Sequence, residues 1–75
     1  MTIGERAVRE VIKHAGSPSV SAVRKELVKL DIPDSSYRGW KRDNMNPSAY
    51  YLAKMASAGY DIYWILLGEK HGEEK

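Results

Sequence analysis

The segment DIPDSSYRGWKRDN, residues 31–44, constrains the fold more than any other part of the chain. No helix can run through it, because Pro33 lacks an amide hydrogen and pushes the preceding residue out of helical geometry. We therefore expect a tight corner over residues 31–34. A new helix, over about residues 34–43, can start behind Asp34 or Ser35, whose short side-chain oxygens accept hydrogen bonds from the free amides of a first turn.

The helix after this corner has one aromatic and one basic face. At about 100° per residue, Tyr37 and Trp40 share a face, so they are expected to pack inward. The opposite face and its flanks carry Ser35, Ser36, Arg38, Gly39, Lys41 and Arg42. Such a face suits the groove of a DNA duplex, whereas the alternative is a solvated basic face on an ordinary helical bundle.

The residues of this basic face divide by chemistry into two groups. Serine and glycine let a backbone approach the bases closely, and an arginine can pair two donors with O6 and N7 of a guanine. The expected base-facing residues are Ser35, Ser36, Arg38 and Gly39. Lys41 and Arg42 are expected to reach phosphates, and Asp34 is expected to cap the helix rather than to recognise a cytosine.

Two helices are predicted before the corner. Thr2 and Glu5 form a capping box that starts the first helix, and Gly16 ends it. Its apolar stripe is Ile3, Ala7, Val8, Val11, Ile12 and Ala15, with Arg6, Arg9, Glu10 and Lys13 outside the stripe and His14 on the surface. The second helix is expected to start with Ser17 as cap and Pro18 at its first position. Its inner face is Val20, Val23, Leu27 and Leu30. Its outer face is Arg24, Lys25 and Lys29, which we interpret as solvated, with contact to a phosphate backbone as the alternative.

A fourth helix is predicted after the corner helix. Asn46 is its expected cap, Pro47 its first residue and Gly59 its end. Its core face is expected to contain Leu52, Met55 and Ala56. The free amides of its first turn form an anion site that can hold a DNA phosphate. The residues beside these amides are Asn44, Asn46 and Ser48.

The segment DIYWILLGEKHGEEK predicts a short and very apolar fifth helix, capped by Asp61 and ended by Gly68. The residues expected to pack inward are Ile62, Trp64, Ile65 and Leu66. Six apolar or aromatic residues in succession cannot all face one core, so Tyr63 and Leu67 are expected on the surface as a patch for self-association. The chain is thus predicted to be all-α, a compact five-helix bundle over residues 1–69 with a charged tail over residues 70–75.

Composition argues against several classes of function. There is no cysteine, and His14 and His71 are too far apart in sequence to suggest a metal site, so we expect neither a metal nor a cofactor. No pairing of a nucleophile with a base and no glycine-rich phosphate loop can be assembled, which argues against an enzyme. The longest apolar run, residues 62–67, is far below the roughly 18 residues that span a bilayer, so we expect a cytoplasmic protein without a membrane segment.

The charges are unevenly distributed along the chain. Residues 1–60 hold ten Lys and Arg against six Asp and Glu, a net charge of +4, whereas residues 61–75 hold two against four, a net charge of −2. A basic body favours an anionic partner such as nucleic acid.

The corner LDIPDSSYRGWKR, the fourth helix with its Asn-Pro start and the ending DIYWILLGE together resemble the lambda-repressor-like DNA-binding domain of phage and prophage repressors and Cro proteins. The resemblance covers about residues 20–69. It implies a helix-turn-helix whose two helices are locked together by Leu30, Ile32, Tyr37 and Trp40. It also implies that the corner helix supplies the base contacts, and that the fifth helix matches the one through which some of these repressors dimerise.

The expected function is therefore that of a sequence-specific, double-stranded DNA-binding transcriptional repressor of phage or prophage type, acting as a homodimer or dimerising on DNA. Each protomer would place its corner helix in one major-groove half-site of a near-palindromic operator. One alternative is the N-terminal domain of a longer repressor, with HGEEK as the start of a linker. Another is a protein-interaction module, such as a phage adaptor or antirepressor, which fits the modest net charge and the carboxylates of Asp34 and Asp43 beside the basic face.

Overall fold

The computed structural model describes residues 1–69, and every regular element within this range is a helix. The five helices are α1 (Ile3–Ala15), α2 (Val20–Leu30), α3 (Asp34–Arg42), α4 (Ala49–Ser57) and α5 (Ile62–Leu67). The predicted all-α, five-helix class is therefore confirmed. The predicted charged tail, residues 70–75, lies outside the described residues.

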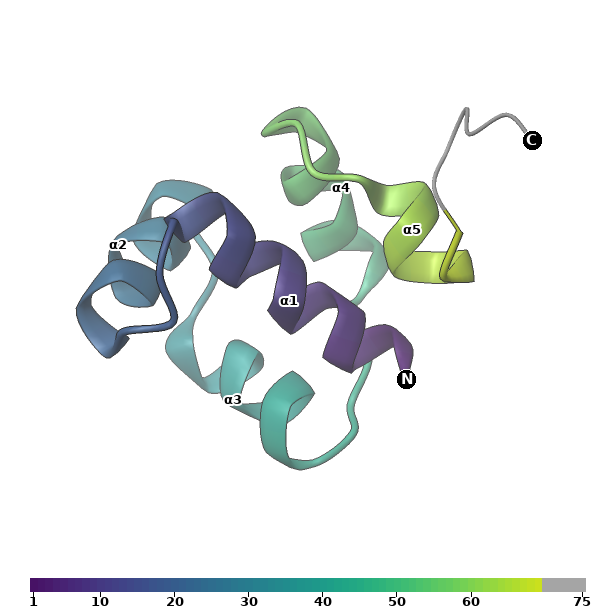
Figure 1. Ribbon diagram of the computed structural model, residues 1–75, viewed down its shortest axis with the longest axis horizontal. Coiled ribbons are helices and arrows are strands. Elements are labelled where there is room, and N and C mark those ends of the chain that lie inside the picture. Colours follow the sequence, from purple (N-terminus) through teal and green to yellow (C-terminus); the bar gives the residue numbers. More distant parts are fainter. Residues whose placement is uncertain (70–75) are drawn as a thin grey trace.

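Helix α1 lies at the centre of the fold and packs against α2, α3 and α5 (Figure 1). It starts with the predicted capping box, in which the Glu5 amide donates to Thr2 Oγ1 over 3.1 Å and the Thr2 amide donates to Glu5 Oε1 over 2.8 Å. It ends at Gly16, whose left-handed backbone, with φ of 84°, is unstrained because glycine has no Cβ. The core of the domain consists of Ala7, Val11, Val23, Leu27, Leu30, Ile32, Tyr37, Trp40, Met55, Tyr60 and Ile65.

Helices α2 and α4 begin later than predicted, because the serine after each proline is the cap. Ser19 rather than Ser17 caps α2, and Ser48 rather than Asn46 caps α4. Each of the two capping hydroxyls accepts a hydrogen bond from the amide three residues later. Each proline therefore lies one residue before the cap instead of at the first helical position, and the serine hydroxyl satisfies one free amide of the first turn.

Three apolar residues that were predicted to pack inward are exposed. Val20 is the first residue of α2 and is 69 % exposed. Ala56 in α4 and Leu66 in α5 are also exposed, because each of these short helices fully buries a single residue, Met55 and Ile65 respectively. These predictions were wrong because they assumed a wider buried face than a domain of this size can cover.

Two charged residues that were predicted to lie outside the apolar stripe of α1 are covered by other elements. Arg6 Nε donates to the carbonyl of Ile65 over 2.8 Å, and Arg6 Nη2 donates to the carbonyl of Leu66 over 3.2 Å. These carbonyls lie in the last turn of α5, where a helix has no further amides to satisfy them. Glu10 is 5 % exposed and accepts a hydrogen bond from the Asp61 amide over 3.2 Å.

A buried polar cluster joins α1, α2 and the segment between α4 and α5. Its centre is the hydroxyl of Tyr60, which donates to Glu26 Oε2 over 2.5 Å, and both residues are buried. His14 stacks on the ring of Tyr60 with 3.8 Å between the ring centroids. Burial, together with the carboxylate of Glu26, raises the pKa of Tyr60 well above its usual value.

Replacing Tyr60 with phenylalanine is expected to lower the free energy of unfolding at neutral pH by about 1–3 kcal/mol, because the buried carboxylate of Glu26 loses its hydroxyl donor. The raised pKa also predicts an effect at alkaline pH. Above pH 10 the unfolded chain releases the Tyr60 proton while the folded chain keeps it, so stability falls as pH rises. Urea unfolding of the unchanged protein and of Tyr60→Phe, between about pH 8 and 11, tests this. The free energy of unfolding should fall less steeply with pH in the variant. If the free energies of unfolding of the two proteins fall in parallel as pH rises, the Tyr60 hydroxyl does not cause the loss.

Candidate nucleic-acid interface

The corner between α2 and α3 is built as the sequence predicts. Asp31 adopts left-handed geometry, with φ of 58°, and its amide donates to the carbonyl of Val28 over 3.0 Å. The amide of Ile32 donates to the carbonyl of Leu27 over 2.9 Å, and the Ile32 side chain is 4 % exposed. These contacts end α2 and fix the direction in which α3 starts.

The first turn of α3 differs from the predicted cap. Pro33 occupies the N-cap position and no side chain caps the helix, so the prediction of a cap at Asp34 or Ser35 was wrong. Asp34 is instead the first helical residue, and its Oδ2 lies 3.0 Å from Arg38 Nε, one turn further along. The carboxylate therefore holds an arginine side chain and also places a negative charge in the first turn, where the helix dipole favours it.

The inner face of α3 anchors the helix through the two predicted aromatic rings. Tyr37 and Trp40 are 5 % and 3 % exposed, and their rings meet edge to face with 6.3 Å between centroids. Trp40 makes a second edge-to-face contact with Tyr51 of α4, at 6.2 Å. Burial, and to a lesser extent the charge of Asp34, raises the pKa of the Tyr37 hydroxyl. The prediction of a packed aromatic face is confirmed.

One side of α3 borders a hollow of about 230 Å³, the α2–α3 hollow, whose other wall is the start of α2. Its charged lining consists of Arg24, Arg38, Lys41, Arg42 and Asp34. Within the described part of the chain, Arg38 is the one cation of this group that forms an ion pair with a carboxylate. Four positive charges thus face one negative charge across a short stretch of surface, which gives a local field that attracts anions.

The Arg38–Asp34 pair is open to solvent, with side-chain exposures of 57 % and 42 %. An exposed ion pair contributes at most about 1 kcal/mol, so it does not prevent Arg38 from binding another group. The contact engages Nε, while the two terminal nitrogens of the guanidinium keep donors for a planar acceptor such as the edge of a guanine.

The other side of α3 borders a second hollow of about 320 Å³, the α3–α4 hollow, between α3 and the start of α4. Its polar side chains are Ser35, Ser36, Asn46 and Ser48. The Ser48 hydroxyl accepts from the Tyr51 amide over 3.4 Å as the cap of α4. The N-terminal end of α4 therefore opens toward this hollow, and helix N-termini favour negatively charged groups.

Gly39 does not lie on the open face of α3. It is buried, and a Cβ at this position would lie 3.0 Å from the sulfur of Met45, which folds over the helix. The expectation that Gly39 faces bases is therefore corrected, because the loop after α3 covers it. Gly4 of α1 allows this loop to approach closely because it has no side chain. A Cβ at this position would overlap the Met45 carbonyl oxygen and lie 3.2 Å from the Trp40 carbonyl oxygen.

The structure brings most of the predicted DNA-facing residues together beside α3. Those that line its two hollows are Ser35, Ser36, Arg38, Lys41, Arg42, Asn46 and Ser48. Asn44 lines neither hollow and adopts positive φ, 55°, in the exposed loop that follows α3. Gly39 lines the α3–α4 hollow beneath the Met45 side chain.

Arg24, for which we preferred a solvated face over a phosphate contact, is also a member of this surface. It comes from α2 and lines the α2–α3 hollow together with the basic residues of α3. The spacing of α2 alone shows that Arg24 points outward, but only the angle between α2 and α3 determines that it lies beside Arg38 and Arg42.

The predicted self-association patch is exposed on α5. Tyr63 is 40 % exposed and Leu67 is 59 % exposed, and Leu66, which was predicted to pack inward, adds a third exposed apolar side chain at 41 %. These three residues follow one another closely on a helix of six residues at the edge of the fold (Figure 1). An exposed apolar cluster of this kind is typical of protein contact surfaces.

Comparisons with models of protein families, with characterised proteins and with solved structures find no match to this chain. Within residues 1–69, no cluster of three or more His, Cys, Asp or Glu side chains is arranged to hold a metal ion. None of the helices in this range has the length and apolar character needed to cross a bilayer.

Proposed function

We propose that this chain is a sequence-specific, double-stranded DNA-binding repressor of the lambda-repressor-like type, in which α2 and α3 form the helix-turn-helix. The observation that carries the proposal is the exposed face of α3. It presents serine and arginine side chains between a strongly basic hollow and the N-terminal end of α4. This function places the protein in the cytoplasm, where bacterial DNA lies.

The dimensions of α3 suit a major groove. An α-helix with its side chains is about 10–12 Å across and the major groove is about 12 Å wide, so α3 can lie in it with its aromatic face turned to the protein. Phosphates on one side of the groove would then meet Arg24, Lys41 and Arg42. Phosphates on the other side would meet Asn46, Ser48 and the first amides of α4.

Base recognition is assigned to Ser35, Ser36 and Arg38. Arg38 is the strongest candidate because its side chain can offer two parallel donors to a guanine, and because Asp34 limits the orientations of its guanidinium. The serines are small and accept or donate hydrogen bonds, so they suit close approach without fixing one base.

The exposed patch of Tyr63, Leu66 and Leu67 is the proposed dimer contact. Burial of apolar side chains between two copies would add to the limited core of a domain of this size. Two-fold symmetry would then place two α3 helices in half-sites about one helical turn apart, so the operator would be nearly palindromic.

Replacing Arg38 with alanine is expected to lower affinity for the preferred duplex by about 1–3 kcal/mol and to relax the base preference at one position of each half-site. Fluorescence anisotropy with duplexes that vary one base pair at a time measures both quantities. The matched change Lys25→Ala, on the outer side of α2, should leave the base preference intact. If Arg38→Ala weakens all duplexes by the same factor, Arg38 contacts phosphate and the assignment as a base reader is wrong.

A further inference from the structure

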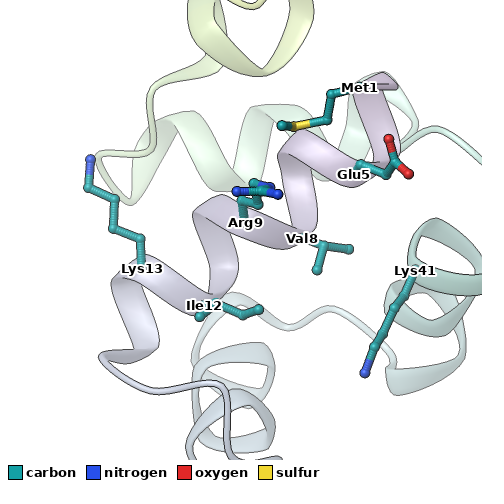
Figure 2. A pocket seen from close by; sticks show the side chains of 7 residues that line it. All are labelled: Met1, Glu5, Val8, Arg9, Ile12, Lys13 and Lys41. Atoms are coloured by element: carbon teal, nitrogen blue, oxygen red, sulfur yellow. The ribbon is translucent and has the colours of Figure 1, made fainter.

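A third hollow lies on the far side of Lys41, along the outer face of α1 (Figure 2). Its volume is about 630 Å³, larger than either hollow beside α3. Five of its lining residues come from α1, spread from Glu5 to Lys13, so the hollow extends about 12 Å along the helix axis. We call it the α1 hollow.

The floor of the α1 hollow is apolar and its edges are basic. Val8 and Ile12 are half-buried, one turn apart on α1. Figure 2 shows these two side chains between Arg9 and Lys13 on one side and Lys41 of α3 on the other. Met1, 63 % exposed, adds a further apolar side chain at one end of the hollow.

In the described part of the chain, the cations around this hollow, Arg9, Lys13 and Lys41, form no ion pairs. The one acidic side chain that lines the hollow is Glu5, and its Oε1 accepts the Thr2 amide as part of the capping box. The hollow therefore combines apolar side chains with an excess of positive charge, three cations against the one carboxylate of Glu5.

We propose that the α1 hollow binds an acidic amphipathic helical segment of a partner protein. Apolar side chains of such a segment, spaced three and four residues apart, would cover Val8 and Ile12. Its carboxylates would face Arg9 and Lys13 on one edge and Lys41 on the other. The apolar floor distinguishes this site from the DNA-facing surface, because a phosphodiester backbone gains nothing from contact with valine and isoleucine side chains.

The experiment uses the full chain and a synthetic peptide of about 15 residues as the probe. The peptide carries leucines at positions i, i+3, i+4 and i+7 and glutamates beside them. A control peptide has the same leucines with lysine in place of every glutamate. Fluorescence anisotropy measures both affinities, and amide chemical-shift changes in ¹⁵N-labelled protein locate the contact.

The acidic peptide is expected to bind at least tenfold more tightly than the lysine peptide and to shift the amides of α1 around Val8 and Ile12. The double variant Arg9→Ala/Lys13→Ala should weaken this binding by about tenfold. The double variant Arg24→Ala/Arg42→Ala removes the same charge from the α2–α3 hollow and should change peptide affinity less than twofold.

Three results would overturn the proposal. The first is the absence of saturable binding of the acidic peptide. The second is equal binding of both peptides with shifts confined to α5, which would indicate nonspecific contact with the apolar patch. The third is a duplex of random sequence shifting the same α1 amides as strongly as the peptide, which would make the hollow part of the DNA surface. Because the peptide titration contains no DNA, its failure leaves the proposed repressor function untouched.

Discussion

Replacing Trp40 with alanine is expected to lower the free energy of unfolding by about 3–5 kcal/mol, which is enough to unfold most of a domain of this size. The reason is the position of this residue at the junction of three elements. Trp40 is 3 % exposed, meets Tyr37 within α3 and Tyr51 from α4, and its carbonyl lies against Gly4 of α1. Loss of the ring would leave a cavity that these elements cannot close without moving α3.

Urea unfolding followed by circular dichroism measures this effect. Tyr50→Ala is the matched control, because Tyr50 is an aromatic residue of the adjacent helix and is 65 % exposed. Its replacement should cost less than about 1 kcal/mol. A Trp40→Ala protein with nearly unchanged stability would show that the indole is not part of the core and that α3 presents another face to the solvent.

The second large effect concerns DNA binding. The double variant Arg24→Ala/Arg42→Ala is expected to lower affinity for every duplex, whatever its sequence, by roughly 25-fold at about 150 mM salt. Each lost phosphate contact removes about 0.9 from the slope of log K against log salt, which corresponds to about fivefold per contact at this salt concentration. The slope should therefore flatten by about two.

Arg9→Ala/Lys13→Ala is the control for this prediction, since it removes the same charge from the outer face of α1. Its salt slope should match that of the unchanged protein. Equal losses in both double variants would mean that the affinity depends on overall charge and not on the α2–α3 hollow. No loss in either would contradict the proposed orientation on DNA.

Local sequence signals predicted the order of the helices and most of their ends. The capping box at Thr2 and Glu5, the Asp61 cap and the glycines at positions 16 and 68 act within one helical turn, so their effect can be predicted without knowledge of the fold. The corner at Pro33 is equally local, and the spacing of Tyr37 and Trp40 identified the buried face of α3.

Features that depend on contacts between distant segments were not predictable from periodicity. By spacing, Glu10 and Glu26 point outward, yet both are buried. Their carboxylates accept hydrogen bonds from distant residues: Glu26 from the Tyr60 hydroxyl, 34 residues away, and Glu10 from the Asp61 amide, 51 residues away. Burial on the surface around α3 was likewise not predictable from periodicity. Gly39 lies on the outer side of its helix by geometry alone, and it is buried because Met45 folds back over it.

Arg24 shows how the candidate site itself depended on tertiary structure. Its outward direction followed from the spacing of α2, whereas its position beside Arg38 follows from the angle at the Asp31–Pro33 corner. The sequence therefore predicted the serine and basic side chains that α3 exposes, and the positions of α2 and α4 beside α3 supply the two hollows of the candidate site.

The most direct test of the proposed function is the selection of bound duplexes from a pool of random DNA sequences, carried out at two salt concentrations. For a dimeric, sequence-specific repressor we expect a nearly palindromic consensus whose two half-sites lie about one helical turn apart and which is enriched at both concentrations. A pool that stays random while binding disappears at the higher salt concentration would show nonspecific electrostatic affinity and would contradict sequence-specific repression.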